Sequence, residues 1–211
     1  MEERVAGSVV KGSSGGLRGT LHRPAHGNGN GIVLTHGAGT DSNAPLLVRL
    51  SRSFEEAGYH VLRYDLPFRQ QGRPPNPAQA VRDRAGVVEA VTALRGIVTG
   101  RIVAAGHSYG GRQSAMAAAE NAGLADGLVL FSYPLHPPAK PDQLRTAFFP
   151  DLRTPALFVH GTRDPFGSIE ELRTHIALIP ARTDLLAVEG AAHDLKRAPD
   201  LAQEIIARML F

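Results

Sequence analysis

The hexapeptide GHSYGG, residues 106–111, places a serine between small residues where the sequence pattern changes. The apolar run before it is typical of a buried strand, and the alanine-rich run after it is typical of a helix. Gly106, Ser108 and Gly110 fit the pattern G-x-S-x-G, in which a sharp turn from strand to helix exposes a serine hydroxyl. Such a hydroxyl can act as a nucleophile, so the pattern indicates acyl transfer at Ser108.

A serine hydroxyl is a weak nucleophile at neutral pH, and it needs a nearby base that is oriented by a third group. His193 follows an apolar run in the segment EGAAHDL, and Asp164 follows another in HGTRDPFG. Taken singly, a histidine at a strand end is more often a packing residue, and an aspartate before a proline is often a turn residue. The chain order Ser108, Asp164, His193 is the order expected for a catalytic triad, and the coincidence favours catalysis.

The negative charge that forms on the substrate oxygen during acyl transfer needs backbone N–H donors. The first expected donor is Tyr109, directly after the nucleophile. The second is expected from the glycine-rich segment THGAGTD, in which Ala38 is the predicted residue. The alternative for this segment is a flexible turn without such a role.

The remaining sequence predicts the platform that positions these loops. Short apolar runs alternate with segments of helical spacing, which implies parallel βαβ units with helices on both faces of a sheet. In such folds reactive groups gather at the carboxyl ends of the strands. Strands are expected within 4–10, 17–24, 31–39, 59–67, 102–106, 127–133, 155–161 and 184–190, the first two as an antiparallel hairpin, and helices over 42–57, 78–97, 109–121, 168–178 and 199–211.

Length and composition limit the class of protein. A chain of 211 residues without a linker or internal repeat predicts a single domain over 1–211. The chain has 43% hydrophobic and 20% charged residues, which is typical of a soluble globular protein. The absence of cysteine excludes disulfides, a thiolate nucleophile and cysteine metal sites. No apolar run suits a signal peptide or a membrane span, so a cytoplasmic protein without membrane insertion is expected.

The charge distribution bears on the partners. The net charge is +3, and arginine supplies 20 of the 23 basic residues. These arginines are scattered among acidic residues and few lie beside aromatic ones, so a solvated surface is expected and a nucleic-acid partner is not. The expected partner is a small-molecule ester, bound by a monomer or a homodimer.

Together these residues resemble the α/β-hydrolase superfamily over nearly the whole chain, from about residue 17 to residue 211. THGAGTDSNAPLL, YDLPFRQQGRPPNP and GHSYGGRQS look like a small lidless branch related to dienelactone-hydrolase-like proteins and to the hydrolase-like domain of a testis-expressed protein and a chromatin-complex subunit. The resemblance implies an α/β-hydrolase fold without a cap domain. It also implies a triad of Ser108, Asp164 and His193, with the backbone of Ala38 and Tyr109 as the oxyanion hole. True dienelactone hydrolases use a cysteine nucleophile, so their substrate is not carried over.

The segment LHPPAKPDQLRTAFFPDLRT, between two predicted strands, is too short for a helical cap, so an open site is expected. Loops beside the site supply several candidates for its rim. For the aromatic candidates the alternative is core or loop packing, and for the arginines it is solvation. The candidates are Phe68, Arg69, Arg73, Tyr133, Phe148 and Phe166.

Two other kinds of site are alternatives to the serine site. His36, His107 and His160 all follow predicted strands, so a three-histidine zinc site is an alternative. The serine turn favours these histidines as loop supports. The segment HGAGTDS lacks the glycine spacing and the lysine of a phosphate-binding loop.

The predicted function is a serine carboxylesterase that cleaves small or medium esters through an acyl-enzyme, without a metal or organic cofactor. A thioesterase or an amidase could use the same triad. A non-catalytic binding or scaffold protein that retains the fold is the alternative from another class.

Overall fold

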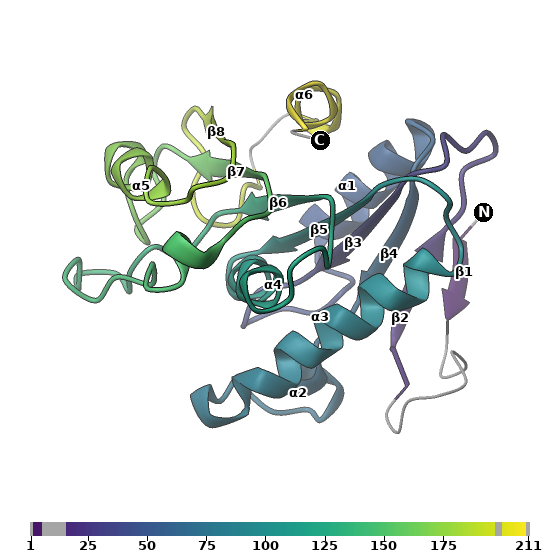
Figure 1. Ribbon diagram of the computed structural model, residues 1–211, viewed down its shortest axis with the longest axis horizontal. Helices are drawn as coiled ribbons and strands as arrows, with labels where there is room; N and C mark the ends of the chain where they lie inside the picture. The colour runs from purple at the N-terminus through teal and green to yellow at the C-terminus, as the bar shows by residue number, and fades with distance from the viewer. Residues whose placement is uncertain (1, 6–15, 197–199, 210–211) are drawn as a thin grey trace.

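The computed structural model describes residues 2–5, 16–196 and 200–209, and their strands form one eight-stranded sheet (Figure 1). The strand order is β1-β2-β4-β3-β5-β6-β7-β8. The pairs β1–β2 and β2–β4 are antiparallel, and the other pairs are parallel. The strands are β1 (Glu2–Val5), β2 (Gly19–His22), β3 (Gly31–Thr35), β4 (His60–Tyr64), β5 (Ile102–His107), β6 (Gly127–Phe131), β7 (Ala156–Gly161) and β8 (Thr183–Val188).

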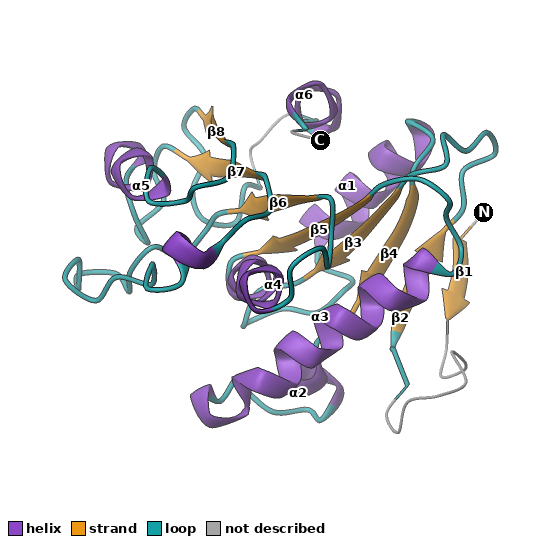
Figure 2. Cartoon of the chain, in the orientation of Figure 1, coloured by secondary structure: helices purple, strands orange, loops and turns teal. Residues whose placement is uncertain are grey.

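Helices cover both faces of the sheet (Figure 2). Apolar side chains of α3, α4 and α5 pack in one core cluster, and those of α1 and α6 pack in a second cluster on the opposite face. Strand residues alternate between the clusters, as Val33 joins the first and Ile32 and Leu34 join the second. The helices are α1 (Pro45–Glu56), α2 (Pro67–Gln70), α3 (Ala80–Arg95), α4 (Tyr109–Glu120), α5 (Ile169–Ile176) and α6 (Ala202–Arg208), with 3₁₀ turns η1 (Pro77–Gln79) and η2 (Phe149–Asp151).

This arrangement confirms the predicted α/β fold, with corrections at the element ends. The first helix begins at Pro45 rather than at residue 42, because the segment before it forms a turn. In that turn Asn43 N–H donates to the Asp41 carboxylate at 2.8 Å, and Ser42 N–H donates to Asp65 at 2.7 Å. The short helix α2 was not expected from the sequence. The predicted hairpin strands pair as β1 and β2, but residues 6–15 between them lie outside the described residues, as do residue 199 and residues 210–211 of the predicted last helix.

The carboxyl ends of the parallel strands carry the loops of interest. The register pairs Thr35 of β3 with Gly106 of β5, and Gly161 of β7 with Val188 of β8. The loop after each strand therefore starts beside the loop of its neighbour. Between β6 and β7, all residues are described and the only regular element is η2, so no cap domain covers this edge. None of the described helices combines the length and apolar character needed to cross a bilayer.

Candidate active site

Ser108 lies at the turn between β5 and α4, with φ 51° and ψ −115°. This left-handed backbone conformation is strained for a residue with a side chain, and such strain is typical of functional turns. Glycines permit the tight turn, because a Cβ on Gly106 would lie 2.5 Å from the nitrogen of Gly111, and one on Gly110 would overlap the carbonyl oxygen of His36. The backbone N–H of Ser108 donates to the carbonyl of Phe131 at 2.8 Å, which anchors the turn to β6.

Three loops bring Ser108, His193 and Asp164 into one hydrogen-bonded chain. The distance from Ser108 Oγ to His193 Nε2 is 2.8 Å, and the distance from His193 Nδ1 to Asp164 Oδ2 is also 2.8 Å. The carboxylate accepts a hydrogen bond from Nδ1–H, so the proton of the neutral imidazole lies on Nδ1 and Nε2 is free to accept a hydrogen bond from the serine hydroxyl. This geometry is what a serine nucleophile with a histidine base requires.

The carboxylate and the imidazole are held from further sides. Asp164 is buried, and its Oδ1 accepts the backbone N–H of Phe166 at 2.9 Å. The ring of Phe166 lies against His193, with centroids 4.2 Å apart and planes inclined by 32°. The imidazole is therefore fixed both by the carboxylate and by an aromatic ring.

The two predicted oxyanion residues line the same cavity as Ser108. The first backbone hydrogen bond of α4 runs from Arg112 N–H to the carbonyl of Ser108. Tyr109 N–H precedes this donor, so the hydrogen bonds of the helix do not use it. The loop of Ala38 is held by Arg69, whose guanidinium donates to the carbonyls of Thr40 at 2.8 Å and Ala38 at 3.3 Å. Both residues thus lie beside the nucleophile, as an oxyanion hole requires.

The three histidines of the zinc alternative each bond to backbone. His36 Nε2 accepts Leu66 N–H at 3.1 Å, so its Nδ1 carries the proton and donates to the carbonyl of Gly37 at 2.8 Å. His107 Nε2 donates to the carbonyl of His193, and His160 Nε2 donates to that of Gly167, both at 2.8 Å. Burial lowers the pKa of all three. They act as loop supports, and within the described ranges no group of three or more His, Asp or Glu residues is arranged to hold a metal ion.

The low pKa of His107 makes stability depend on pH. Burial lowers this pKa from 6.5 to about 4 in the folded protein. As the pH falls from 6.5 towards 4, the unfolded chain takes up a proton that the folded protein does not, so the free energy of unfolding falls. We expect His107 to contribute about 2–3 kcal/mol to this loss.

Urea unfolding of the wild type and of His107→Gln at pH 7 and pH 4.5 measures the effect. Glutamine can still donate to the His193 carbonyl but does not titrate, so the variant should lose less stability between the two pH values. An equal loss in both proteins would contradict the assignment.

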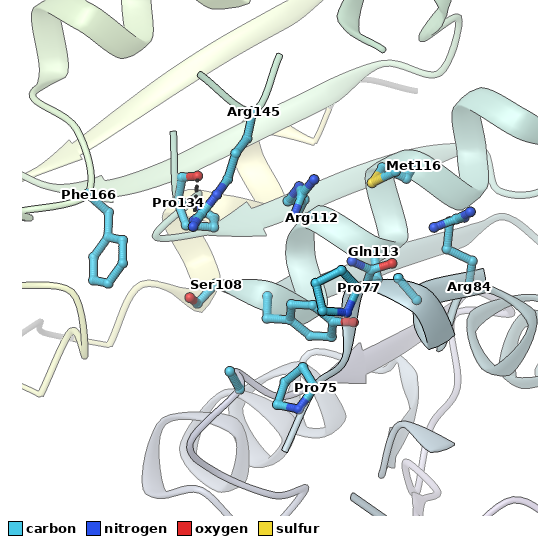
Figure 3. Close-up of a pocket in the computed structure, with 13 residues that line it drawn as sticks. Pro75, Pro77, Arg84, Ser108, Arg112, Gln113, Met116, Pro134, Arg145 and Phe166 are labelled. Carbon is cyan, nitrogen blue, oxygen red and sulfur yellow. Dashed lines mark hydrogen bonds between the residues drawn. The ribbon is translucent and has the colours of Figure 1, made fainter. Parts of the chain in front are cut away.

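Ser108 opens into a cavity of about 460 Å³ (Figure 3). Of the six rim candidates, only Phe166 lines it. Phe68 and Tyr133 are buried core residues, so placing them at the rim was wrong. Phe148 packs edge-on against Phe149, Arg69 bonds to the Ala38 loop, and Arg73 is exposed outside the cavity lining.

Most residues of the cavity wall were not predicted from the sequence. Arg112, Gln113 and Met116 face it from α4, about one and two turns after Ser108. Their spacing along the helix from the nucleophile is the signal that could have revealed them. The other lining residues come from segments distant in sequence and carried no such signal; they are Pro75, Pro77, Ala80, Arg84, Pro134 and Arg145.

A buried carboxylate ties the nucleophile helix to its neighbours. Asp83 of α3 accepts the hydroxyl of Tyr109 at 2.7 Å and the backbone N–H of Phe68 at 3.1 Å. The ring of Tyr109 also packs edge-on against Phe68, with centroids 5.6 Å apart. Asp83 therefore positions the first residue of α4.

Tyr109→Phe tests this contact. The variant leaves one oxygen of a buried carboxylate without its donor, which typically costs about 1–3 kcal/mol of stability. Asp83→Asn should cost less, because its amide can donate to the tyrosine hydroxyl. Thermal or urea unfolding of both variants checks the order, and a larger loss for Asp83→Asn would contradict it.

Comparison with known proteins agrees with this fold. A sequence model of the family described as alpha/beta hydrolase domain matches residues 28–205. Among solved structures, dienelactone hydrolase from Anabaena variabilis is 20% identical with a TM-score of 0.74, and the match covers 99% of this chain and 94% of that one. An α/β serine hydrolase without a lid from Xanthomonas campestris is 18% identical with a TM-score of 0.72, over 91% and 88% of the two chains.

An α/β serine hydrolase homologue from Coxiella burnetii is 17% identical with a TM-score of 0.73, over 90% of each chain. At these identities the solved structures establish the fold, here in its small form without a lid. The family match extends over most of the chain. The protein therefore belongs to the alpha/beta hydrolase domain family.

Proposed function

We propose that the protein is a serine hydrolase, and specifically a carboxylesterase that cleaves small or medium esters through an acyl-enzyme intermediate. The observation that carries the proposal is the continuous hydrogen-bonded chain Ser108–His193–Asp164, with 2.8 Å at each link. A protein that only binds ligands has no need of this chain.

In the proposed reaction Ser108 Oγ attacks the ester carbonyl carbon while its proton moves to His193 Nε2. Asp164 stabilises the imidazolium through its bond to Nδ1. The backbone N–H groups of Ala38 and Tyr109 donate to the oxygen of the tetrahedral intermediate. When the intermediate collapses, the proton passes from Nε2 to the departing alkoxide.

The acyl group then remains on Ser108 as an ester. A water molecule gives a proton to His193 Nε2 and attacks the acyl carbon. As the second tetrahedral intermediate collapses, the bond from the acyl carbon to Ser108 Oγ breaks and His193 Nε2 returns the proton to Ser108 Oγ. Carboxylic acid and free enzyme result. Every proton in this cycle passes through Nε2, so no cofactor is required by the proposal.

A panel of matched substrates tests the reaction class. It contains p-nitrophenyl acetate, butyrate and octanoate, the acyl-CoA thioesters of the same acids, and the corresponding p-nitroanilides. We expect the esters to give the highest kcat/KM, with the shorter acyl chains preferred because the cavity is about 460 Å³. Faster turnover of thioesters or anilides would replace carboxylesterase by thioesterase or amidase, and failure of every substrate would count against a hydrolase.

The sequence-based expectations of a cytoplasmic location, of a monomer or homodimer, and of no nucleic-acid or membrane partner stay predictions. For the proposed function they imply only that the substrate is a small diffusible molecule. Size-exclusion chromatography with light scattering tests the oligomeric state.

A further inference from the structure

Three arginines line the cavity wall beyond Ser108: Arg84, Arg112 and Arg145 (Figure 3). Arg84 has a counter-ion, because its Nε donates to the carboxylate of Glu120 at 2.7 Å. Among the described residues, no carboxylate forms an ion pair with Arg112 or Arg145. The wall therefore carries two positive charges, those of Arg112 and Arg145, that are not paired with any carboxylate in the described part of the chain.

These two charges are also poorly solvated. Both residues are only partly exposed, and Arg112 Nε is buried without a hydrogen-bond partner. Arg145 Nη1 donates to the carbonyl of Pro134 at 3.3 Å, a neutral acceptor. Burial and the nearby charge of Arg112 lower the pKa of Arg145, which indicates that the two guanidinium groups repel each other. An anion beside both groups would remove the repulsion and supply acceptors to the guanidinium donors.

The remaining wall suits the uncharged part of a ligand. Met116, Ala80, Pro75, Pro77 and Phe166 present apolar surface around the cavity. A ligand that fits would have a reactive carbonyl at Ser108, an apolar body and an anionic group. Ser108 directly precedes α4, and Arg112 lies in the first turn of that helix, so α4 fixes the spacing between the carbonyl carbon and this part of the anion site.

We propose that the natural substrate is an ester that carries an anionic group, a carboxylate or a phosphoryl group, and that Arg112 and Arg145 bind this group. The inference rests on the proposed function and names its substrate class. A guanidinium group presents paired N–H donors that match the oxygens of either anion, so the two arginines set specificity while the Ser108 chain performs the chemistry.

Pairs of esters that differ only in the anion test the proposal. On the acyl side, p-nitrophenyl hexanoate is compared with the mono-p-nitrophenyl ester of adipic acid and with p-nitrophenyl 5-phosphonopentanoate. On the alcohol side, phenyl hexanoate is compared with 4-(hexanoyloxy)benzoate and 4-(hexanoyloxy)phenyl phosphate. The uncatalysed hydrolysis of each ester is subtracted, and the quantity compared is the ratio of kcat/KM for the anionic and the neutral ester.

In the wild type we expect this ratio to exceed about tenfold for at least one pair, and to fall with rising ionic strength. The better anion identifies the group as carboxylate or phosphoryl. Arg112→Gln and Arg145→Gln should each reduce the ratio about tenfold or more. The matched control is Arg173→Gln, which removes the same charge from an exposed site on α5 outside the cavity lining and should keep the wild-type ratio.

Arg112→Lys and Arg145→Lys keep the charge but lose the paired donors. Their ratios are expected to lie between those of the wild type and the glutamine variants, whereas a folding defect would lower kcat/KM for anionic and neutral esters alike. A wild-type ratio near one for every pair, or ratios that neither glutamine variant changes, would overturn the proposal.

The outcome separates this inference from the proposed function. If neutral esters are cleaved without any preference for anionic ones, the anion site fails and the hydrolase stands. If no ester is cleaved, calorimetric titration of the wild type and Arg112→Gln with adipate and with inorganic phosphate decides. Binding that the variant loses would retain the anion site while the hydrolase fails, and no binding to either protein would reject both.

Discussion

Replacing Ser108 by alanine is expected to lower kcat for p-nitrophenyl esters by roughly 10⁴- to 10⁶-fold. The variant keeps the backbone of the turn but removes the oxygen that lies 2.8 Å from His193 Nε2. Without that oxygen no acyl-enzyme can form. Initial rates at substrate concentrations on both sides of KM measure the loss.

Ser114→Ala is the matched control, because Ser114 is a buried serine of α4, the helix that follows the Ser108 turn, and does not line the cavity. It should retain most of the wild-type activity. Unfolding curves of both variants test whether misfolding causes the loss of activity in Ser108→Ala. A Ser108→Ala protein that remains as active as Ser114→Ala would contradict the assignment of the nucleophile.

Asp164→Asn should lower kcat by roughly 10³- to 10⁴-fold while the protein stays folded. The carboxylate accepts two hydrogen bonds, one from Phe166 N–H at 2.9 Å and one from His193 Nδ1–H at 2.8 Å. Asparagine has only one acceptor oxygen. If that oxygen stays with Phe166, the amide NH₂ faces Nδ1 and favours the tautomer with a proton on Nε2, which cannot accept the proton of Ser108.

Asp194→Asn is the control for this substitution. Asp194 is exposed, follows His193 directly, and pairs with Lys196 at 3.1 Å. The same chemical change at this position should leave kcat within a small factor of the wild type. A similar loss of kcat in the two variants would mean that a general disturbance near His193, and not the orientation of the imidazole by Asp164, lowers the rate.

The sequence predicted that Ser108, Asp164 and His193 lie together, as the structure has them, because the signals of these residues are local. The turn at Ser108 needs glycines at fixed offsets, and the structure explains them by the close approach of Gly106 to Gly111 and of Gly110 to the His36 carbonyl. The alternation of apolar runs and helical spacing likewise predicted the parallel sheet. The ends of the helices and strands were predicted less accurately. The first helix begins only at Pro45, because the residues before it form a turn in which Asn43 N–H donates to the Asp41 side chain.

The walls of the site could not be read in the same way. Phe68 and Tyr133 follow strands, as active-site residues do, but their rings turn into the core, where Phe68 packs against Tyr109 and Tyr133 against Phe149. Arg145 reaches the cavity from a long irregular segment, in which no periodic sequence pattern indicates which side chains face the cavity. Which side of a loop faces a cavity depends on tertiary packing, which composition and spacing do not encode.

Labelling with a fluorophosphonate probe tests whether Ser108 is an activated nucleophile, because such probes react with a serine only when a base activates it. We expect a single covalent adduct on the wild-type chain, located by peptide mass spectrometry at Ser108. Labelling should be absent in Ser108→Ala and much slower in Asp164→Asn. An unlabelled wild-type protein, or an adduct that persists in Ser108→Ala, would contradict it.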